Sequence, residues 1–278
     1  MWLDNSDVHT KFIFDLEFVG DIQGDVRNCR IWEIGCVCLS TGHPFNTIVS
    51  PMTTRSALTC SKNGVIPANV DEIDKRGVPI GEALRQWCTW IHECCGANKI
   101  ASALLMSHNC FKSDLLVLMC EMGRLNLIFA GPVLFFDTLP FIRYALRSER
   151  RTSFSLKDLC TEPCSQTHRA VDDCFRLSSV LLRCPSQISG IATTFGSIPL
   201  IAIDGIGPRT CMDLYKNGYY CVRQLLELIS RHHGSTSAIA CTEYLHSVQT
   251  AARCGYPLFV CTTTTAHSVS AFCTRMGW

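Results

Sequence analysis

Two acidic residues interrupt the apolar run KFIFDLEFVG near the start of the chain. Asp15 and Glu17 lie two residues apart, and the period of a strand places both side chains on one face of a sheet. Burying carboxylates is costly unless cations or a bound metal compensate their charge. The simpler alternative is an edge strand that exposes both acids to water.

Two further aspartates stand where helical patterns begin. Asp114 follows SHNCFKS and opens an apolar helix, and Asp173 lies in HRAVDDC. The helix dipole favours acids in a first turn, so each alone has an ordinary explanation. Two divalent cations about 3.5 to 4 Å apart, acting on a phosphodiester, require several oxygen ligands from different elements. Together with Asp15 and Glu17, these aspartates supply such a set.

A histidine precedes the last aspartate. His168 comes five residues before Asp173, which places it in the loop that leads into the helix. Beside metal-bound carboxylates, a histidine can take a proton from the attacking water because its ordinary pKa lies near neutrality. Considered alone, it would be a surface residue more often than not. The spacing from His168 favours Asp173 over Asp172 as the ligand, and we expect Asp172 to be solvated or to cap the helix.

The order of apolar segments predicts an α/β fold that positions these residues. Runs at 11–20, 31–39 and 45–49 predict three consecutive strands, joined as antiparallel neighbours. A loop-rich stretch over 51–79 follows. The pattern then predicts a covering helix over 81–95, strands over 100–106 and 133–136, and helices over 114–125, 138–146, 155–160 and 170–182. We expect Asp137 to cap the helix that begins at Thr138.

Five segments in order carry a family resemblance: FDLE, SHNCFKSD, FFDTL, SFSLKDLC and HRAVDDC, within residues 11–184. They resemble the DEDDh exonucleases of the DnaQ-like, ribonuclease H-fold superfamily. The six-residue step from His108 to Asp114 resembles the three-prime repair exonuclease branch. The tyrosine-containing subclass is excluded, because Arg169 stands at its tyrosine position. The resemblance implies an α/β ribonuclease H-like exonuclease fold, a mixed five-stranded sheet flanked by helices, over residues 8–188.

The same resemblance implies a 3′→5′ exonuclease that releases nucleoside monophosphates with two Mg²⁺ or Mn²⁺ ions. By the family pattern, Asp15, Glu17 and Asp173 hold the first metal. Asp15 and Asp114 serve the second, and His168 activates the water. An RNA-trimming enzyme of the same fold and a catalytically silent nucleic-acid-binding protein are the alternatives.

Departures from the family pattern leave the substrate preference open. Phe18 and Val19 replace the usual threonine pair, and 63–65 reads Asn-Gly-Val in the segment that resembles the family's HGI loop. Phe18 either stacks against the 3′-terminal base, a contact worth about 1 to 3 kcal/mol, or packs in the core. Asn109, in the HN…D element, is a second candidate for substrate contact.

A change in composition beyond Cys184 predicts a boundary near residue 190 and a small, mainly helical C-terminal unit over 189–278. Within it, residues 198–230 resemble a helix-hairpin-helix segment. Gly205 and Gly207 form a tight turn before a helix that starts with Pro208, and Arg209 and Lys216 follow. Such a turn either binds DNA phosphates or is a packing device. We favour phosphate binding, which directs the expected substrate toward DNA.

Composition limits the other function classes. The formal net charge of +1 means that any nucleic-acid binding must be local. Nineteen cysteines, an odd number without framework spacing or a preceding apolar signal segment, predict reduced thiols in the cytoplasm or nucleus. No apolar run has the length of a membrane span. We therefore expect no membrane. The family resemblance, together with the helix-hairpin-helix-like segment, implies single-stranded DNA 3′ ends as the partner, ahead of RNA.

Overall fold

The computed structural model describes residues 9–23, 25–60, 65–98, 100, 102–149, 151–160, 169–184, 192–194, 198–203, 206, 214, 219, 221–225, 227 and 271–272. The chain divides into two compact units: residues 1–22 with 28–195, and residues 23–27 with 196–278. The division into an exonuclease domain over 8–188 and a unit over 189–278 stays a prediction. No described helix has the length and apolar character needed to cross a membrane.

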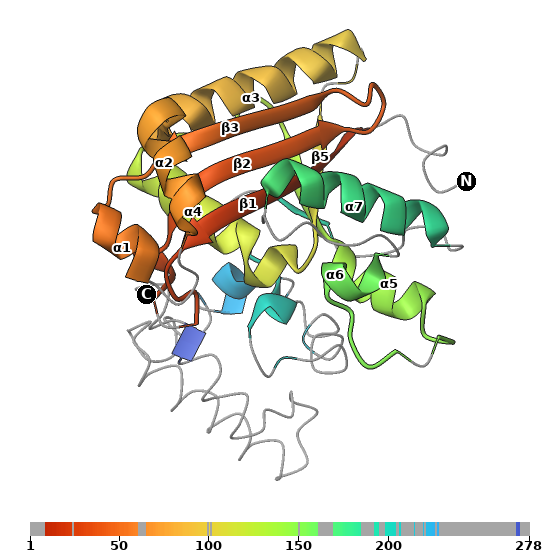
Figure 1. The fold of residues 1–278 in the computed structure, drawn as a ribbon. Coiled ribbons are helices and arrows are strands. Elements are labelled where there is room, and N and C mark those ends of the chain that lie inside the picture. Colours follow the sequence, from red (N-terminus) through yellow and green to blue (C-terminus); the bar gives the residue numbers. More distant parts are fainter. Residues whose placement is uncertain are drawn as a thin grey trace. The chain divides into compact units, whose positions relative to one another are not determined.

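A mixed sheet forms the centre of the first unit, with strands in the order β4-β3-β2-β1-β5-β6-β7 (Figure 1). β2 is antiparallel to both β1 and β3, whereas β5 and β6 run parallel to β1. This confirms the predicted α/β class with its mixed sheet. The strand bounds are β1 (Thr10–Val19), β2 (Arg30–Cys38), β3 (Pro44–Ser50), β4 (Val78–Pro79), β5 (Ala103–Ser107), β6 (Val133–Asp137) and β7 (Ala192–Thr194).

Two of these strands were not expected from the sequence. β4 has two residues and pairs in parallel with β3, while β7 has three and pairs antiparallel with β6. They extend the predicted five strands by one short strand at each edge.

Helices flank the sheet, and those that the periodicity predicted are present. Their bounds are α1 (Arg55–Cys60), α2 (Pro67–Arg76), α3 (Ile80–Ala97), α4 (Asp114–Arg124), α5 (Thr138–Ala145), α6 (Leu156–Leu159) and α7 (Ala170–Arg183). Three short 3-10 turns, η1 (Val26–Asn28), η2 (Cys110–Lys112) and η3 (Leu200–Ala202), complete the described elements.

The prediction of loops over 51–79 is wrong, because α1 and α2 lie there. α2 begins with Pro67, whose missing N–H costs nothing in a first turn. It buries only Asn69, Val70 and Ile73, so its ten residues are mostly polar. With so few apolar positions, the helical period is weak in the sequence.

Alternation along β1 separates the two faces of the sheet. Phe14 and Phe12 contact Trp87 and Trp90 of α3, with ring centroids 5.8 and 5.6 Å apart. Ile13 instead belongs to the apolar cluster that includes Leu177, Val180 and Leu181 of α7. Since side chains alternate along a strand, Asp15 and Glu17 share the α7 face with Ile13. The strand thus directs both acids toward α7.

Candidate metal-binding active site

The strand pairing places the two β1 acids beside β2. Asp15 is the cross-strand partner of Gly35, and Glu17 is the partner of Glu33. The register shifts between Glu17 and Phe18, which marks a β-bulge directly after the second acid. Bulges re-aim the side chains next to them, and this one lies at the end of the acidic pair.

Gly35 lets α7 approach the sheet at this point. A Cβ atom there would lie 2.4 Å from the carbonyl carbon of Ala170 and 2.4 Å from the backbone nitrogen of Val171. Only glycine therefore permits the first turn of α7 to rest on β2 next to Asp15. The backbone N–H of Asp173 donates to the carbonyl of Arg169 at 3.1 Å, which closes that first turn.

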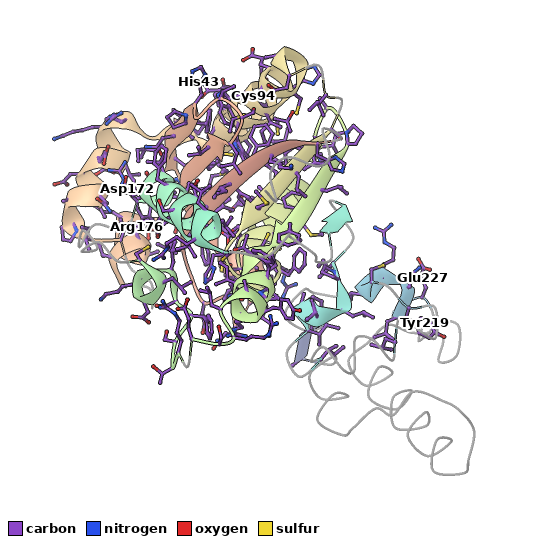
Figure 2. The ribbon with its side chains drawn as sticks, turned by 90° about the vertical axis from the view of Figure 1, so that its right-hand side faces the viewer. His43, Cys94, Asp172, Arg176, Tyr219 and Glu227 are labelled. Atoms are coloured by element: carbon purple, nitrogen blue, oxygen red, sulfur yellow. The ribbon has the colours of Figure 1, made fainter. Side chains whose placement is uncertain are left out.

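This packing brings three of the predicted ligands together. One carboxylate oxygen from each of Asp15, Glu17 and Asp173 lies within 4.8 Å of the others. Among the described residues, this is the group of histidine, cysteine and acidic side chains that could hold a metal ion. Asp173 also accepts a hydrogen bond from Arg176 in the next turn of α7, at 2.5 Å. Asp172 and Arg176 are labelled on this helix in Figure 2.

Asp114 lies outside this group of three but is fixed to the same strand. The backbone N–H of Leu16, between the two β1 acids, donates to Asp114 Oδ1 at 3.0 Å. The hydroxyls of Ser107 and Ser113 donate to its Oδ2 at 2.9 and 2.7 Å. The side chain is buried, and these three bonds hold it in one orientation.

Burial and neighbouring carboxylates destabilise the charged forms of Asp15 and Glu17. Burial raises the pKa of Asp15 well above its usual range, and the charges of Asp114, Glu17 and Asp173 add to the effect. Burial, then Asp173 and Glu33, raise the pKa of Glu17 to about 8. Burial also raises that of Asp114 to about 6, although its hydrogen bonds oppose the shift. A bound divalent cation would offset this repulsion, so the donor set fits a hard metal ion.

A buried ion pair anchors the start of α7 to the sheet. The carboxylate of Glu33 has no exposed surface and accepts from Arg169 Nε at 2.9 and 3.1 Å. The same carboxylate accepts from the backbone N–H of Ala170 at 3.4 Å, while Arg169 itself supplies no side-chain cap for α7. Arg169 also donates to Glu72 of α2 at 2.9 Å. Glu33 therefore caps α7 from a neighbouring strand.

His108 directly follows β5, next to Ser107, which donates to Asp114; the carboxylates of Asp15, Glu17, Asp114 and Asp173 are called the acidic cluster below. His108 Nε2 lies 2.8 Å from the carbonyl oxygen of Phe154, which can only accept, so Nε2 carries the proton. Burial lowers the pKa of His108, the bond to Phe154 opposes this, and the nearby charges of Arg143 and Asp173 act in opposite directions.

The remaining predicted residues have different outcomes. Asp137 caps α5 as expected, accepting from the N–H of Leu139 at 3.0 Å, and also accepts from Phe111 N–H at 3.2 Å. Asn109 adopts a left-handed conformation with φ 62° in the turn before η2. Phe18 is half-buried at the bulge, which leaves both of its proposed roles open. Five predicted residues lie outside the described residues: His168, Gly205, Gly207, Arg209 and Lys216.

Sequence reasoning overlooked several residues that build the site. Gly35, inside an otherwise apolar strand, carried a usable signal, because an interior glycine often marks close backbone approach. Ser107 and Ser113 flank Asp114 within one short segment and could also have been suspected. The pairing of Glu33 with Arg169 joins residues 136 positions apart and left no local signal.

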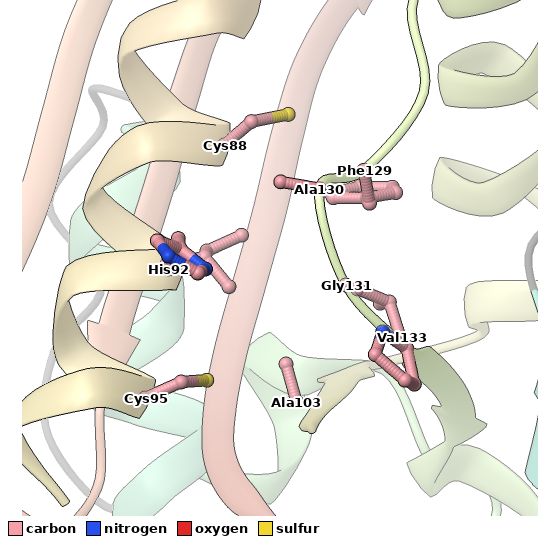
Figure 3. A pocket seen from close by; sticks show the side chains of 10 residues that line it. Cys88, His92, Cys95, Ala103, Phe129, Ala130, Gly131 and Val133 are labelled. Atoms are coloured by element: carbon pink, nitrogen blue, oxygen red, sulfur yellow. The ribbon is translucent and has the colours of Figure 1, made fainter. Parts of the chain in front are cut away.

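A small cavity elsewhere in this unit is not a second candidate. It lies between α3 and the segment before β6, has a volume of about 20 Å³, and is lined in part by Cys88, His92, Cys95, Ala103 and Phe129 (Figure 3). That volume holds about one water molecule, and no carboxylate lines it.

Comparisons with known proteins give distant likenesses. No family model matches the chain, and no curated protein matches it. Among solved structures, cell-death related nuclease 4 aligns with a TM-score of 0.45 and 15% identity over 64% of this chain and 64% of its own. Exonuclease I aligns with a TM-score of 0.46 and 16% identity over 64% of this chain and 41% of its own. The zinc-bound complex of E. coli exonuclease I with single-stranded DNA aligns with a TM-score of 0.44 and 18% identity over 63% of this chain and 39% of its own. The chain thus spans less than two thirds of either protein.

Proposed function

We propose that the protein is a metal-dependent 3′→5′ exonuclease that removes nucleoside monophosphates from the 3′ end of single-stranded DNA. The observation that carries the proposal is the convergence of Asp15, Glu17 and Asp173 within 4.8 Å. Two strand acids and a helix acid, brought together by a backbone contact at Gly35, form a costly arrangement without a cation.

We infer that the acidic residues hold two divalent cations, Mg²⁺ or Mn²⁺. Asp15, Glu17 and Asp173 would hold one ion, and Asp15 with Asp114 would serve the other. When bound, such ions stabilise the attacking and leaving oxygens of a phosphodiester and lower the pKa of water. Ser107, Ser113 and the N–H of Leu16 keep Asp114 oriented for this role. His168 would take the proton from the attacking water.

The C-terminal unit completes the proposal. Residues 189–278, with the helix-hairpin-helix-like segment at 198–230, would bind the strand through Gly205, Gly207 and Arg209. Helix N-terminal amides after a glycine turn bind phosphate oxygens without reading base sequence. Such contacts suit an enzyme that degrades strands of any sequence.

Oligonucleotides labelled at the 5′ end distinguish the possible activities. With Mg²⁺, attack from the 3′ end gives a ladder of shortening labelled strands, whereas attack from the 5′ end releases the label at once. A circular single strand should stay intact, which separates exonuclease from endonuclease cleavage. Matched DNA and RNA strands test the RNA-trimming alternative. The proposal fails if no nucleotide is released, or if release is equal in Asp15→Asn.

A further inference from the structure

Several exposed arginines of the described residues pair with carboxylates. Those on α1 to α4 pair with carboxylates of their own or a neighbouring helix, and the pairs are Arg55 with Asp71 and Asp74, Arg76 with Glu72, Arg85 with Glu82, and Arg124 with Glu121. Arg143 and Arg147, by contrast, have no carboxylate partner among the described residues. A guanidinium without a counter-charge is available for a phosphate.

Arg143 lies on α5 and Arg147 just beyond its end, and the exposed Tyr144 lies between them in the sequence. Phe141 and Ile142 pack into the apolar cluster shared with α7, so the opposite side of α5 points outward. There Tyr144 remains 58% exposed. The guanidinium carbon of Arg147 lies 4.1 Å from the Tyr144 ring centroid, and its Nη1 donates to the Tyr144 carbonyl at 2.8 Å. We call Arg143, Tyr144 and Arg147 the α5 face.

A short chain of contacts joins the α5 face to the acidic cluster. The guanidinium carbon of Arg143 lies 5.9 Å from the ring centroid of Phe154. The carbonyl oxygen of Phe154 accepts from His108, and the preceding residue, Ser107, donates through its hydroxyl to Asp114. α5 itself starts where β6 ends, and β6 runs parallel to β5 and β1. Phe154 and His108 therefore connect the α5 face to the surroundings of Asp114.

We propose that the α5 face binds the single DNA strand on the 5′ side of the scissile bond. Arg143 and Arg147 bind backbone phosphates, and Tyr144 stacks against a base. This inference rests on the proposed function. The chain carries a net charge of only +1, so phosphate binding requires local unpaired cations of this kind. Arginine with an exposed aromatic ring tolerates any sequence, because every base has a face that stacks.

The test compares two substrates of the full-length protein: an oligothymidylate of about 12 nucleotides and a thymidine dinucleotide. The dinucleotide is too short to occupy both the acidic cluster and the α5 face. In Tyr144→Ala and in Arg143→Ala with Arg147→Ala, KM for the long strand should rise about tenfold while kcat stays unchanged. Cleavage of the dinucleotide should remain at the wild-type rate.

Conservative and matched variants sharpen the comparison. Tyr144→Phe should restore the wild-type KM, because the ring is kept. Each arginine removed should reduce the slope of log affinity against log salt by about 0.7. Arg85→Ala, which removes an exposed arginine already paired on α3, should change neither KM nor the salt slope. Thermal unfolding confirms that each variant is folded.

Fluorescence anisotropy measures binding of the labelled long strand in the absence of metal. Because this measurement does not require cleavage, it tests the α5 face separately from the proposed function. If the wild type cleaves neither substrate, the exonuclease proposal fails, and the anisotropy of wild type and variants still decides the binding role. The inference is overturned if the arginine double variant binds the long strand as tightly as the wild type. It is also overturned if dinucleotide cleavage falls as much as long-strand cleavage.

Discussion

Gly35 and Ala170 are in backbone contact, since a Cβ atom on Gly35 would lie 2.4 Å from the carbonyl carbon of Ala170. Gly35 is the cross-strand partner of Asp15, and Ala170 begins the helix that carries Asp173. One glycine therefore sets the separation between acids that are 158 residues apart in the chain.

Gly35→Ala should abolish cleavage. The added methyl group meets backbone atoms that cannot rotate away, so α7 must shift and move Asp173 with it. Overpacking of this kind costs about 1 to 3 kcal/mol of stability. The matched control is Gly96→Ala on the exposed side of α3, where an added Cβ meets nothing within 4 Å. For Gly96→Ala, nucleotide release should proceed at the wild-type rate, and urea unfolding should show a stability equal to or higher than that of the wild type. Full activity in Gly35→Ala would contradict the role of Gly35 in positioning Asp173.

Asp173→Asn should reduce metal-dependent cleavage by at least about 100-fold, since a ligand of the metal loses its charge. Its neighbour Asp172 provides the control, because it lies in the same turn and is not in the carboxylate group. Asp172→Asn should retain the wild-type rate. The rate of nucleotide release at saturating Mg²⁺ distinguishes the two variants. Equal losses of activity would contradict the assignment of Asp173, rather than Asp172, as the metal ligand.

In the absence of metal, the protein should lose stability as the pH rises. The pKa of Glu17 is about 8 in the folded state and about 4.5 in the unfolded chain, so the folded state binds more protons between these values. The free energy of unfolding should fall across this window, by up to about 1.4 kcal/mol per pH unit for one group, and level off above pH 8.

Urea unfolding in a chelator at several pH values measures this slope. Glu17→Gln should flatten it, and Mg²⁺ should stabilise the wild type more at pH 8 than at pH 5, because protonated carboxyl groups bind metal poorly. A free energy of unfolding that rises with pH over the same window would contradict the proposed repulsion between the carboxylates.

Arg169→Leu should destabilise the protein by about 3 to 5 kcal/mol, because it leaves the buried Glu33 without its counter-charge. Adding Glu33→Gln should restore much of the loss, since the amide oxygen can still accept from Ala170. Arg76→Ala, which removes an exposed partner of Glu72, should cost no more than about 1 kcal/mol. A double-mutant cycle from urea unfolding measures the coupling energy between Glu33 and Arg169. If the losses of stability in the two single variants add up in the double variant, the two side chains are not coupled.

The predictable parts of the fold are those with strong periodicity. Alternation in β1 placed Asp15 and Glu17 on one face, and the apolar pattern of α7 located the helix that carries Asp173. α2 was not predicted, because its buried face has only three residues and gives a weak helical period. The contacts that finish the site, Glu33 with Arg169 and Leu16 with Asp114, join residues 136 and 98 positions apart. Such pairs depend on tertiary packing, which local spacing does not encode.

The short strands β4 and β7 have a consequence for association between molecules. An exposed sheet edge offers free N–H and carbonyl groups to any other chain, and long flat edges lead to aggregation. Here β4 offers two residues, one of them Pro79 without an N–H, and β7 offers three. β4 and β7 themselves are therefore too short to serve as templates, so the part of the described sheet edge on which another chain could form a strand is the stretch of β3 over residues 44–48, which β4 does not cover.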